Sequence, residues 1–200
     1  MNFKSLIKSV IQPIVSTYHN WVHRKPVQFT FQAISVNVLP GVFSPKSNPS
    51  TTLFLGYIES LDLNGKTVLE LGSGSGLISG YCASKGAMVT ASDINDEALK
   101  ELSVQSRENN WDVITVYSDL FENVHFHFDY ILINPPFVPK KSTSISETSF
   151  YAGENFEFFD QLFKQLKVRT LRDSEVLLFL PEEAELFPIC RRSKEHHLTL

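Results

Sequence analysis

The hydrophobic and polar positions follow a helical period at the start of the chain and a strand period shortly afterwards. Apolar residues within the first 20 positions recur at helical spacing, which predicts an amphipathic helix. Apolar and polar residues then alternate from 27 to 38, which predicts a strand or hairpin. The Pro- and Gly-containing stretch 40–49 is typical of a loop, and a further helix is expected over 50–61.

After residue 65, short apolar runs alternate with helical segments. Strands are predicted at 67–71, 88–92, 113–117, 128–133 and 175–180, and helices at 76–85, 95–109, 155–171 and 182–195. Apolar strands separated by helices favour a parallel sheet covered on both faces. The sequence therefore predicts an α/β fold, with the Ser/Thr-rich stretch 142–149 as a mobile loop.

Composition narrows the class of protein. With 200 residues, 42% of them hydrophobic and 20% charged, the chain has the size and content of one globular domain. Its two cysteines, Cys82 and Cys190, form neither a disulfide framework nor a CxxC metal clip, so no metal site is expected and a reducing compartment fits. No run approaches the roughly 20 apolar residues of a membrane span, nor the apolar core of a secretory signal. We therefore expect a cytoplasmic location.

The net charge of −4 is unevenly distributed. Residues 1–58 contain five Lys or Arg and no Asp or Glu, whereas the remaining 142 residues contain 13 basic and 22 acidic groups. A basic segment ahead of an acidic body can contact an anionic partner, but a solvated basic helix has the same composition. The charge pattern leaves both interpretations open.

A glycine-rich turn follows the strand at 67–71 and leads directly into a helix, and its sequence is Gly72-Ser73-Gly74-Ser75-Gly76. Such a turn exposes backbone N–H groups at a helix N-terminus to a ligand. The GxGxG spacing matches neither the GxGxxG dinucleotide fingerprint nor a Walker loop. Asp93 and Asp119 end the next two strands, where carboxylates can accept hydrogen bonds from ribose hydroxyls and from an adenine amine. These features together predict a nucleoside-containing cofactor.

The fourth strand, at 128–133, ends in Asn134-Pro135-Pro136-Phe137. The prolines fix the backbone and remove two N–H donors, so the Asn side-chain oxygen and the Pro135 carbonyl can both accept from one –NH2 group. Phe137 offers a face on which a planar group can stack. Accepting both hydrogens out of plane draws a delocalised nitrogen toward tetrahedral geometry and directs its lone pair at an electrophile. Positioning and electrostatics then carry the rate without a strong base.

These residues resemble a known family. The segments VLELGSGSG, SDIN, SDLF and INPPF are similar to motifs of class I S-adenosylmethionine-dependent methyltransferases, in the amino-methylating branch with (N/D)PP(Y/F). The resemblance covers about 36–185. Upstream, LPGVFSPKSNPSTTLFL resembles the cofactor-covering segment of HemK-type release-factor glutamine methyltransferases and of several rRNA and tRNA base methyltransferases, which share a "methyltransferase small" domain. NPPFVPK is closer to the NPPYIP of the glutamine branch than to the NPPFH of rRNA guanine enzymes.

The resemblance implies a Rossmann-like fold, S-adenosyl-L-methionine as cofactor, and a role for each matching residue. The glycines would hold the methionine portion, Glu70 its ammonium group and Asp93 the ribose. The implied cofactor-binding residues are Glu70, Gly72, Ser73, Gly74, Ser75, Gly76, Asp93, Ile94, Asp119, Leu120 and Asn134. The implied catalytic residues, which grip and stack on the acceptor nitrogen, are Asn134, Pro135, Pro136 and Phe137.

The expected activity is methylation of a protein glutamine of the release-factor type. The alternatives are an RNA or DNA base amine, at adenine N6 or guanine N2, and, in a different class, a non-catalytic cofactor-binding subunit. An N-terminal helix and hairpin segment is expected at 1–45 and the methyltransferase domain at 46–200. The resembled fold continues with a final antiparallel strand pair. We therefore expect a five-strand sheet with an exposed edge or a C-terminally truncated chain.

Overall fold

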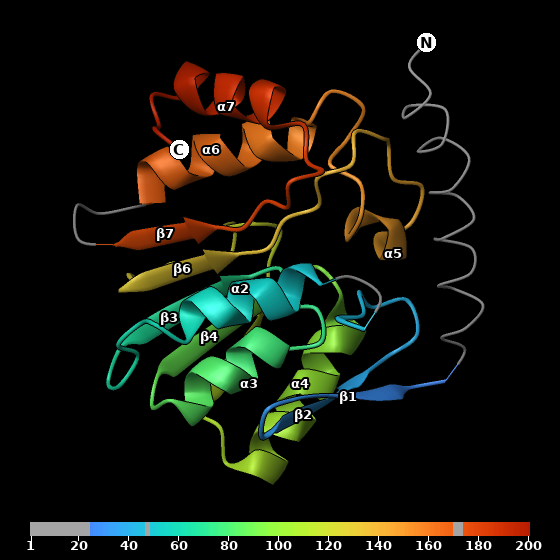
Figure 1. The fold of residues 1–200 in the computed structure, drawn as a ribbon, viewed down its shortest axis with the longest axis vertical. Helices are drawn as coiled ribbons and strands as arrows, with labels where there is room; N and C mark the ends of the chain where they lie inside the picture. Colours follow the sequence, from blue (N-terminus) through green and yellow to red (C-terminus); the bar gives the residue numbers. More distant parts are fainter. Residues whose placement is uncertain (1–24, 47–48, 170–173) are drawn as a thin grey trace.

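A parallel β-sheet forms the centre of the molecule (Figure 1). The computed structural model describes residues 25–46, 49–169 and 174–200, so the helix predicted within the first 20 residues lies outside them. The sheet contains β3 (Thr67–Leu71), β4 (Met88–Asp93), β5 (Val113–Tyr117), β6 (Tyr130–Ile133) and β7 (Glu175–Leu178). In the described ranges the strand order is β5-β4-β3-β6-β7 and every pairing is parallel, which confirms the predicted α/β fold.

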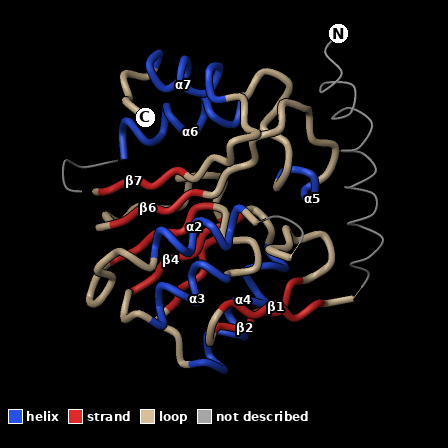
Figure 2. The backbone as a smooth tube through the Cα atoms, viewed as in Figure 1, coloured by secondary structure: helices blue, strands red, loops and turns tan. Residues whose placement is uncertain are grey.

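Helices cover both faces of this sheet (Figures 1 and 2). One face carries α2 (Ser50–Ile58), α3 (Leu77–Ser84) and α4 (Asp96–Asn109), and the other carries α6 (Glu157–Arg169) and α7 (Leu186–Glu195). Neighbouring residues of β3 point to opposite faces, so Val68 belongs to one buried cluster and Leu69 to the other. Within the described ranges, no helix has both the length and the apolar character needed to cross a bilayer.

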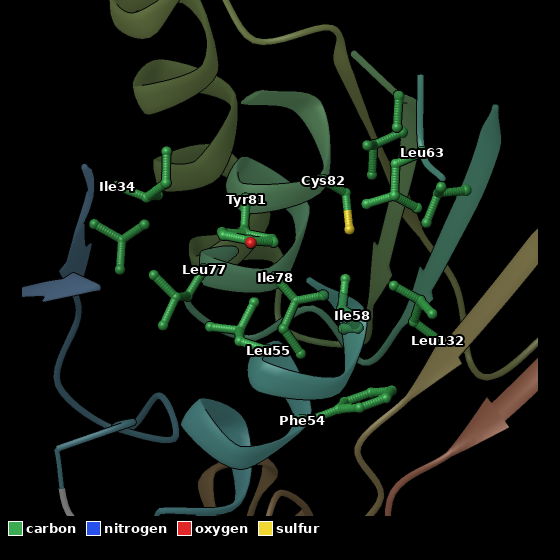
Figure 3. Close-up of a cluster of buried hydrophobic side chains, with 14 of the residues drawn as sticks. Ile34, Phe54, Leu55, Ile58, Leu63, Leu77, Ile78, Tyr81, Cys82 and Leu132 are labelled. Carbon is green, nitrogen blue, oxygen red and sulfur yellow. The ribbon is translucent and has the colours of Figure 1, made fainter. Parts of the chain in front are cut away.

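The predicted hairpin is present and packs on the α2–α4 side. Its strands β1 (Val27–Phe31) and β2 (Ile34–Val38) pair in antiparallel fashion. Figure 3 shows Ile34 facing the cluster that contains Tyr81 of α3. The backbone N–H of Asn37 donates to Gln105 Oε1 of α4 at 2.7 Å, which fixes the hairpin to that helix. This hydrogen bond therefore fixes the position of the end of β2, from which the chain continues into the segment before α2.

Observed element ends differ from the predicted ones by a few residues, as expected for fraying termini. The helix expected over 50–61 ends at Ile58. The stretch 142–149, predicted as a mobile loop, contains the short helix α5 (Ile145–Thr148). The Glu147 carboxylate accepts hydrogen bonds from both the backbone N–H and the hydroxyl of Thr143, each at 2.7 Å. This side-chain contact closes the first turn of α5, and Ser/Thr composition alone does not reveal it.

Arg192 joins α7 to the start of α6. Its side chain is buried, its Nε lies 3.2 Å from Asp160 Oδ2, and its Nη2 donates to the backbone carbonyl of Asn155. The guanidinium also lies over the ring of Phe156, 5.7 Å from the centroid. These contacts fix the position of the segment between Gly153 and α6. This segment borders the pocket described below.

Two helical glycines provide a matched test of packing. A methyl group at Gly80 of α3 would lie 2.7 Å from ring carbons of Trp111, whereas one at Gly56 of α2 would meet no atom within 4 Å. Gly80→Ala should therefore lower the free energy of unfolding by about 1–3 kcal/mol. Gly56→Ala should raise it by about 0.5–1 kcal/mol, because alanine favours the helix. Urea unfolding of both variants measures this, and a shift of the same sign in both would contradict the packing at Trp111.

Candidate active site

The strand register places the predicted motifs in one row. Leu71 of β3 aligns with Ser92 of β4 and with Ile133 of β6. The residues that follow these three therefore begin at the same carboxyl edge of the sheet, and they are Gly72, Asp93 and Asn134. The order of the strands reverses between β3 and β6, since β4 and β5 lie on one side of β3 while β6 and β7 lie on the other. Ligands of open α/β sheets bind at such a switch point.

A pocket of about 480 Å3 opens at this edge. The sequence-predicted residues that line it are Glu70, Gly72, Ser73, Gly74, Ser75, Asp93, Ile94, Asp119, Leu120, Asn134, Pro135, Pro136 and Phe137. Gly76 is the one predicted residue that does not line the pocket. It is buried at the start of α3, and a side chain there would overlap Leu102 of α4. Gly76 therefore allows two helices to approach each other.

Gly72 forms the open part of the glycine loop. Its φ of +79° favours glycine, and an added Cβ would meet no atom within 4 Å, so the backbone faces free space in the pocket. The hydroxyl of the next residue, Ser73, is buried and has no hydrogen-bond partner among the described residues. A buried hydroxyl without a partner, beside an open backbone, fits a polar ligand held by this loop.

Asp93 holds the loop and the start of α4 together. Its Oδ2 accepts from the backbone N–H of Gly74 at 2.7 Å, and its Oδ1 accepts from that of Asn95 at 2.8 Å. Asn95 in turn caps α4 through the N–H of Ala98. Burial raises the pKa of Asp93, while these backbone hydrogen bonds oppose the rise. Each carboxylate oxygen can accept a further hydrogen bond, so Asp93 is able to serve the protein and a ligand together.

Glu70 is buried beneath the glycine loop, where its exposed fraction is 5%. Its Oε2 accepts from the backbone N–H of Ser79 at 2.8 Å and also from the Ser79 hydroxyl. Ser79 lies in the first turn of α3, so Glu70 satisfies one of the free N–H groups there. Burial raises the pKa of Glu70 to about 8, the nearby charge of Asp93 adds to the rise, and the Ser79 hydrogen bonds oppose it. A cation in the pocket would favour the ionised carboxylate.

The side chain of Asn134 is held by hydrogen bonds to α2, a contact that the sequence did not predict. Its Nδ2 donates to Thr51 Oγ1 at 3.2 Å and approaches Ser50 Oγ at 3.5 Å. Both hydroxyl residues are buried in the first turn of α2 and line the pocket. The sequence showed them only as residues at a predicted helix start, a common position for Ser and Thr. Their contact with residue 134 joins positions that are 83 and 84 residues apart, so it leaves no local signal in the sequence.

Two further segments wall the pocket. The rings of Phe43, before α2, and Phe150, after the Asn-Pro-Pro-Phe motif, lie 5.5 Å apart between centroids. The second segment is stiffened by backbone pairing, because Ala152 N–H donates to the Val138 carbonyl at 2.8 Å. Sequence reasoning assigned no role to either ring. The pocket is therefore lined both by the motif-bearing strand ends and by aromatic side chains from distant segments.

Acidic groups at the site are tied to the backbone rather than clustered. Among the described residues, no three His, Cys, Asp or Glu side chains lie together in a way that could hold a metal ion. Glu70 and Asp93 each bind N–H groups as above, and Asp119 is exposed at the end of β5. The arrangement is suited to holding a polar ligand through backbone amides and to presenting Asn134 to a second molecule.

A switch-point pocket with a glycine loop, strand-end carboxylates and an Asn-Pro-Pro-Phe wall defines a Rossmann-like enzyme that binds a nucleoside cofactor. The model of the methyltransferase small domain family matches residues 33–153. This chain belongs to that family. The resemblance to S-adenosylmethionine-dependent methyltransferases predicted from the motifs is thereby confirmed.

Individual relatives differ in how much of them the chain covers. It is 40% identical over 141 residues to a Methanocaldococcus jannaschii protein provisionally assigned as a protein N5-glutamine methyltransferase, a match that covers 68% of this chain and 70% of that protein. It is 36% identical over 111 residues to the ribosomal RNA small subunit methyltransferase C of Haemophilus influenzae, covering 54% of this chain and 33% of the relative. The chain thus spans about a third of that RNA-modifying relative.

Solved structures share the fold at low sequence identity. A Thermus thermophilus 16S rRNA methyltransferase in complex with AdoMet and guanosine superimposes with a TM-score of 0.62 at 20% identity, covering 86% of this chain and 45% of the other. The ribosomal protein L11 methylase of Lactobacillus delbrueckii gives 0.58 at 23% identity, covering 74% and 68%. These neighbours confirm the Rossmann-like sheet with helices on both faces.

The buried Glu70 predicts a pH-dependent stability. Its pKa is about 8 in the folded protein against an ordinary value of 4.5, so folding favours the protonated form. Its contribution is complete below pH 4.5 and is lost as the pH rises through 8. The melting temperature of Glu70→Gln minus that of the wild type should therefore become more positive from pH 5 to pH 8. Differential scanning calorimetry checks this, and a difference that stays constant over that range would contradict the buried, protonated carboxyl.

Proposed function

We propose that this protein transfers a methyl group from S-adenosylmethionine to the side-chain amide nitrogen of a protein glutamine. The observation that carries the proposal is the Asn134 carboxamide at the pocket wall, with its Nδ2 held by α2 and its oxygen left to accept. The 40% identical relative with a provisional protein glutamine assignment supports this acceptor, because the match covers 70% of that protein.

The pocket fits the cofactor on its own chemistry. The open backbone at Gly72 and the Ser73 hydroxyl, which has no partner among the described residues, suit the polar amino-acid portion of the cofactor. Asp93 would hold the ribose hydroxyls, Ile94, Asp119 and Leu120 would border the adenine, and Glu70 would lie near the ammonium group. When bound, S-adenosylmethionine supplies a methyl carbon whose bond to sulfur breaks as the acceptor nitrogen bonds to it, with the nitrogen's proton passing to water.

The chain's own contribution is to orient the acceptor nitrogen. Asn134 Oδ1 and the Pro135 carbonyl accept its two hydrogens, and the two prolines keep these acceptors in place. Drawing both hydrogens to one side directs the nitrogen lone pair toward the cofactor. Phe137, which is half-buried in the pocket wall, stacks on the planar group. Fixed acceptors at the reacting nitrogen make a strong general base unnecessary.

A base amine of RNA or DNA is the second candidate acceptor. Adenine N6 and guanine N2 are planar amines that the same two carbonyl oxygens could grip. The identity to an rRNA methyltransferase and the exposed Lys140 and Lys141, just beyond the motif, favour this alternative. We place it second because the RNA relative is matched over only 33% of its length. The hypothesis of a non-catalytic subunit is the least favoured, because such a subunit would not need an intact Asn134.

Replacing Asn134 should separate catalysis from cofactor binding. Asn134→Ala removes one acceptor from the reacting nitrogen, and we expect methyl transfer to fall at least about 100-fold. Cofactor affinity, measured by calorimetry, should stay within about threefold of wild type. Asn109→Ala serves as the matched control. Asn109 is the last residue of α4 and does not line the pocket, so this variant should transfer methyl groups at the wild-type rate. Wild-type transfer by Asn134→Ala would contradict the mechanism.

The acceptor class is identified with tritiated methyl groups. Purified protein and labelled cofactor are incubated with a fractionated lysate, which is then treated separately with nuclease and with protease. We expect the label to survive nuclease and to appear in methylglutamine after proteolysis. Label that survives protease and is lost with nuclease would overturn the glutamine assignment in favour of a nucleic-acid base.

A further inference from the structure

The side chain of Asn134 has two unlike ends, and only one of them can grip an amine. Its Oδ1 accepts hydrogen bonds, whereas its Nδ2 only donates them. A 180° rotation about the Cβ–Cγ bond exchanges the two ends at little steric cost, since this torsion is broad and roughly two-fold. In the rotated form an N–H donor would face the donor hydrogens of the acceptor. The orientation that can grip an amine therefore needs a second group that accepts a hydrogen bond from Nδ2.

Two hydroxyls of α2 are placed to accept from Nδ2 in that orientation. Nδ2 donates to Thr51 Oγ1 at 3.2 Å and reaches Ser50 Oγ at 3.5 Å, the outer limit of a hydrogen bond. Because the carboxamide is planar, with oxygen and nitrogen on opposite sides of Cγ, this contact turns Oδ1 away from α2. Among the described residues, none donates a hydrogen bond to that oxygen.

The Thr51 hydroxyl is not used by the helix that carries it. Pro49 precedes the first turn of α2, and no side chain caps its free N–H groups. The next hydroxyl along, on Thr52, bonds locally to the Pro49 carbonyl at 2.8 Å. Thr51 is 5% exposed, lines the pocket and directs its oxygen toward Asn134 instead. Two adjacent threonines therefore have different contacts within the same turn.

We propose that Thr51 is a positioning residue for methyl transfer, with Ser50 in a minor supporting part. It holds the Asn134 carboxamide with its oxygen toward the acceptor nitrogen. The inference rests on the proposed function only in that Asn134 grips this nitrogen, and it applies equally to a glutamine amide and to a base amine. It adds to the active site a residue that contacts neither the nitrogen nor the reacting methyl group.

Three variants test the proposal. Thr51→Val keeps the shape and removes the acceptor, so kcat should fall about tenfold, the loss expected for one hydrogen bond. Thr51→Ser keeps the hydroxyl and should remain within about twofold of wild type. Thr52→Val is the matched control, since its hydroxyl bonds only to local backbone, and its kcat should be unchanged. The cofactor Kd, measured by calorimetry, should stay within about twofold in all three.

A second measurement is independent of activity. The side-chain NH2 resonances of Asn134, assigned by their loss in Asn134→Ala, should shift in Thr51→Val and stay in place in Thr52→Val. Unshifted resonances in Thr51→Val would overturn the inference whatever the acceptor. A wild-type kcat in Thr51→Val, or a kcat loss that Thr51→Ser does not restore, would also overturn it.

Failure of the proposed function has a different signature. Full activity in Asn134→Ala would remove the catalytic role of Asn134, while the NMR comparison would still decide whether Thr51 holds its side chain. Label found in nucleic acid would change the acceptor alone, and the Thr51 variants would then be assayed on that acceptor with the same expected loss.

Discussion

The position of β3 between β4 and β6, in one parallel register, is the constraint on which the rest of the structure depends. Register in a buried sheet is strict because a shift of one residue exchanges the two faces of a strand. In β3 that exchange would move Val68 and Leu69 between the two cores. It would also carry Glu70 away from Ser79 and the start of α3. The packing of apolar side chains therefore fixes where the polar groups at the ends of the strands stand.

The same carboxylates that hold the loop are those proposed to hold the cofactor. Glu70 binds Ser79, and Asp93 binds Gly74 and Asn95, so the protein's own hydrogen bonds shape the cradle. Preorganisation of this kind lowers the ordering cost of binding. It is achieved by burying acidic groups, which raises the pKa of both carboxyls. A cation bound beside Glu70 would offset part of that cost, because it favours the ionised carboxylate.

The sequence predicted the α/β fold because apolar runs and turn residues are local signals, and the strands at 67–71 and 113–117 occur where expected. It predicted the strand-end motifs for the same reason. It missed Thr51 and the Phe43–Phe150 contact, since side chains that meet across 83 or more positions leave no periodicity. Gly76 fitted the motif spacing, yet its neighbour is Leu102, which only the packing of α4 against α3 brings close.

The ring contact between Phe43 and Phe150 joins the chain ahead of α2 to the chain beyond the Asn-Pro-Pro-Phe motif. Both rings line the same pocket, so a ligand that displaces one of them disturbs the other. If entry of either substrate separates the rings, part of its binding free energy is used to do so, and the second substrate meets a site already opened. Thermodynamic reciprocity then requires each to strengthen the binding of the other by the same factor. In that case the coupling between cofactor binding and acceptor binding is carried by one aromatic contact.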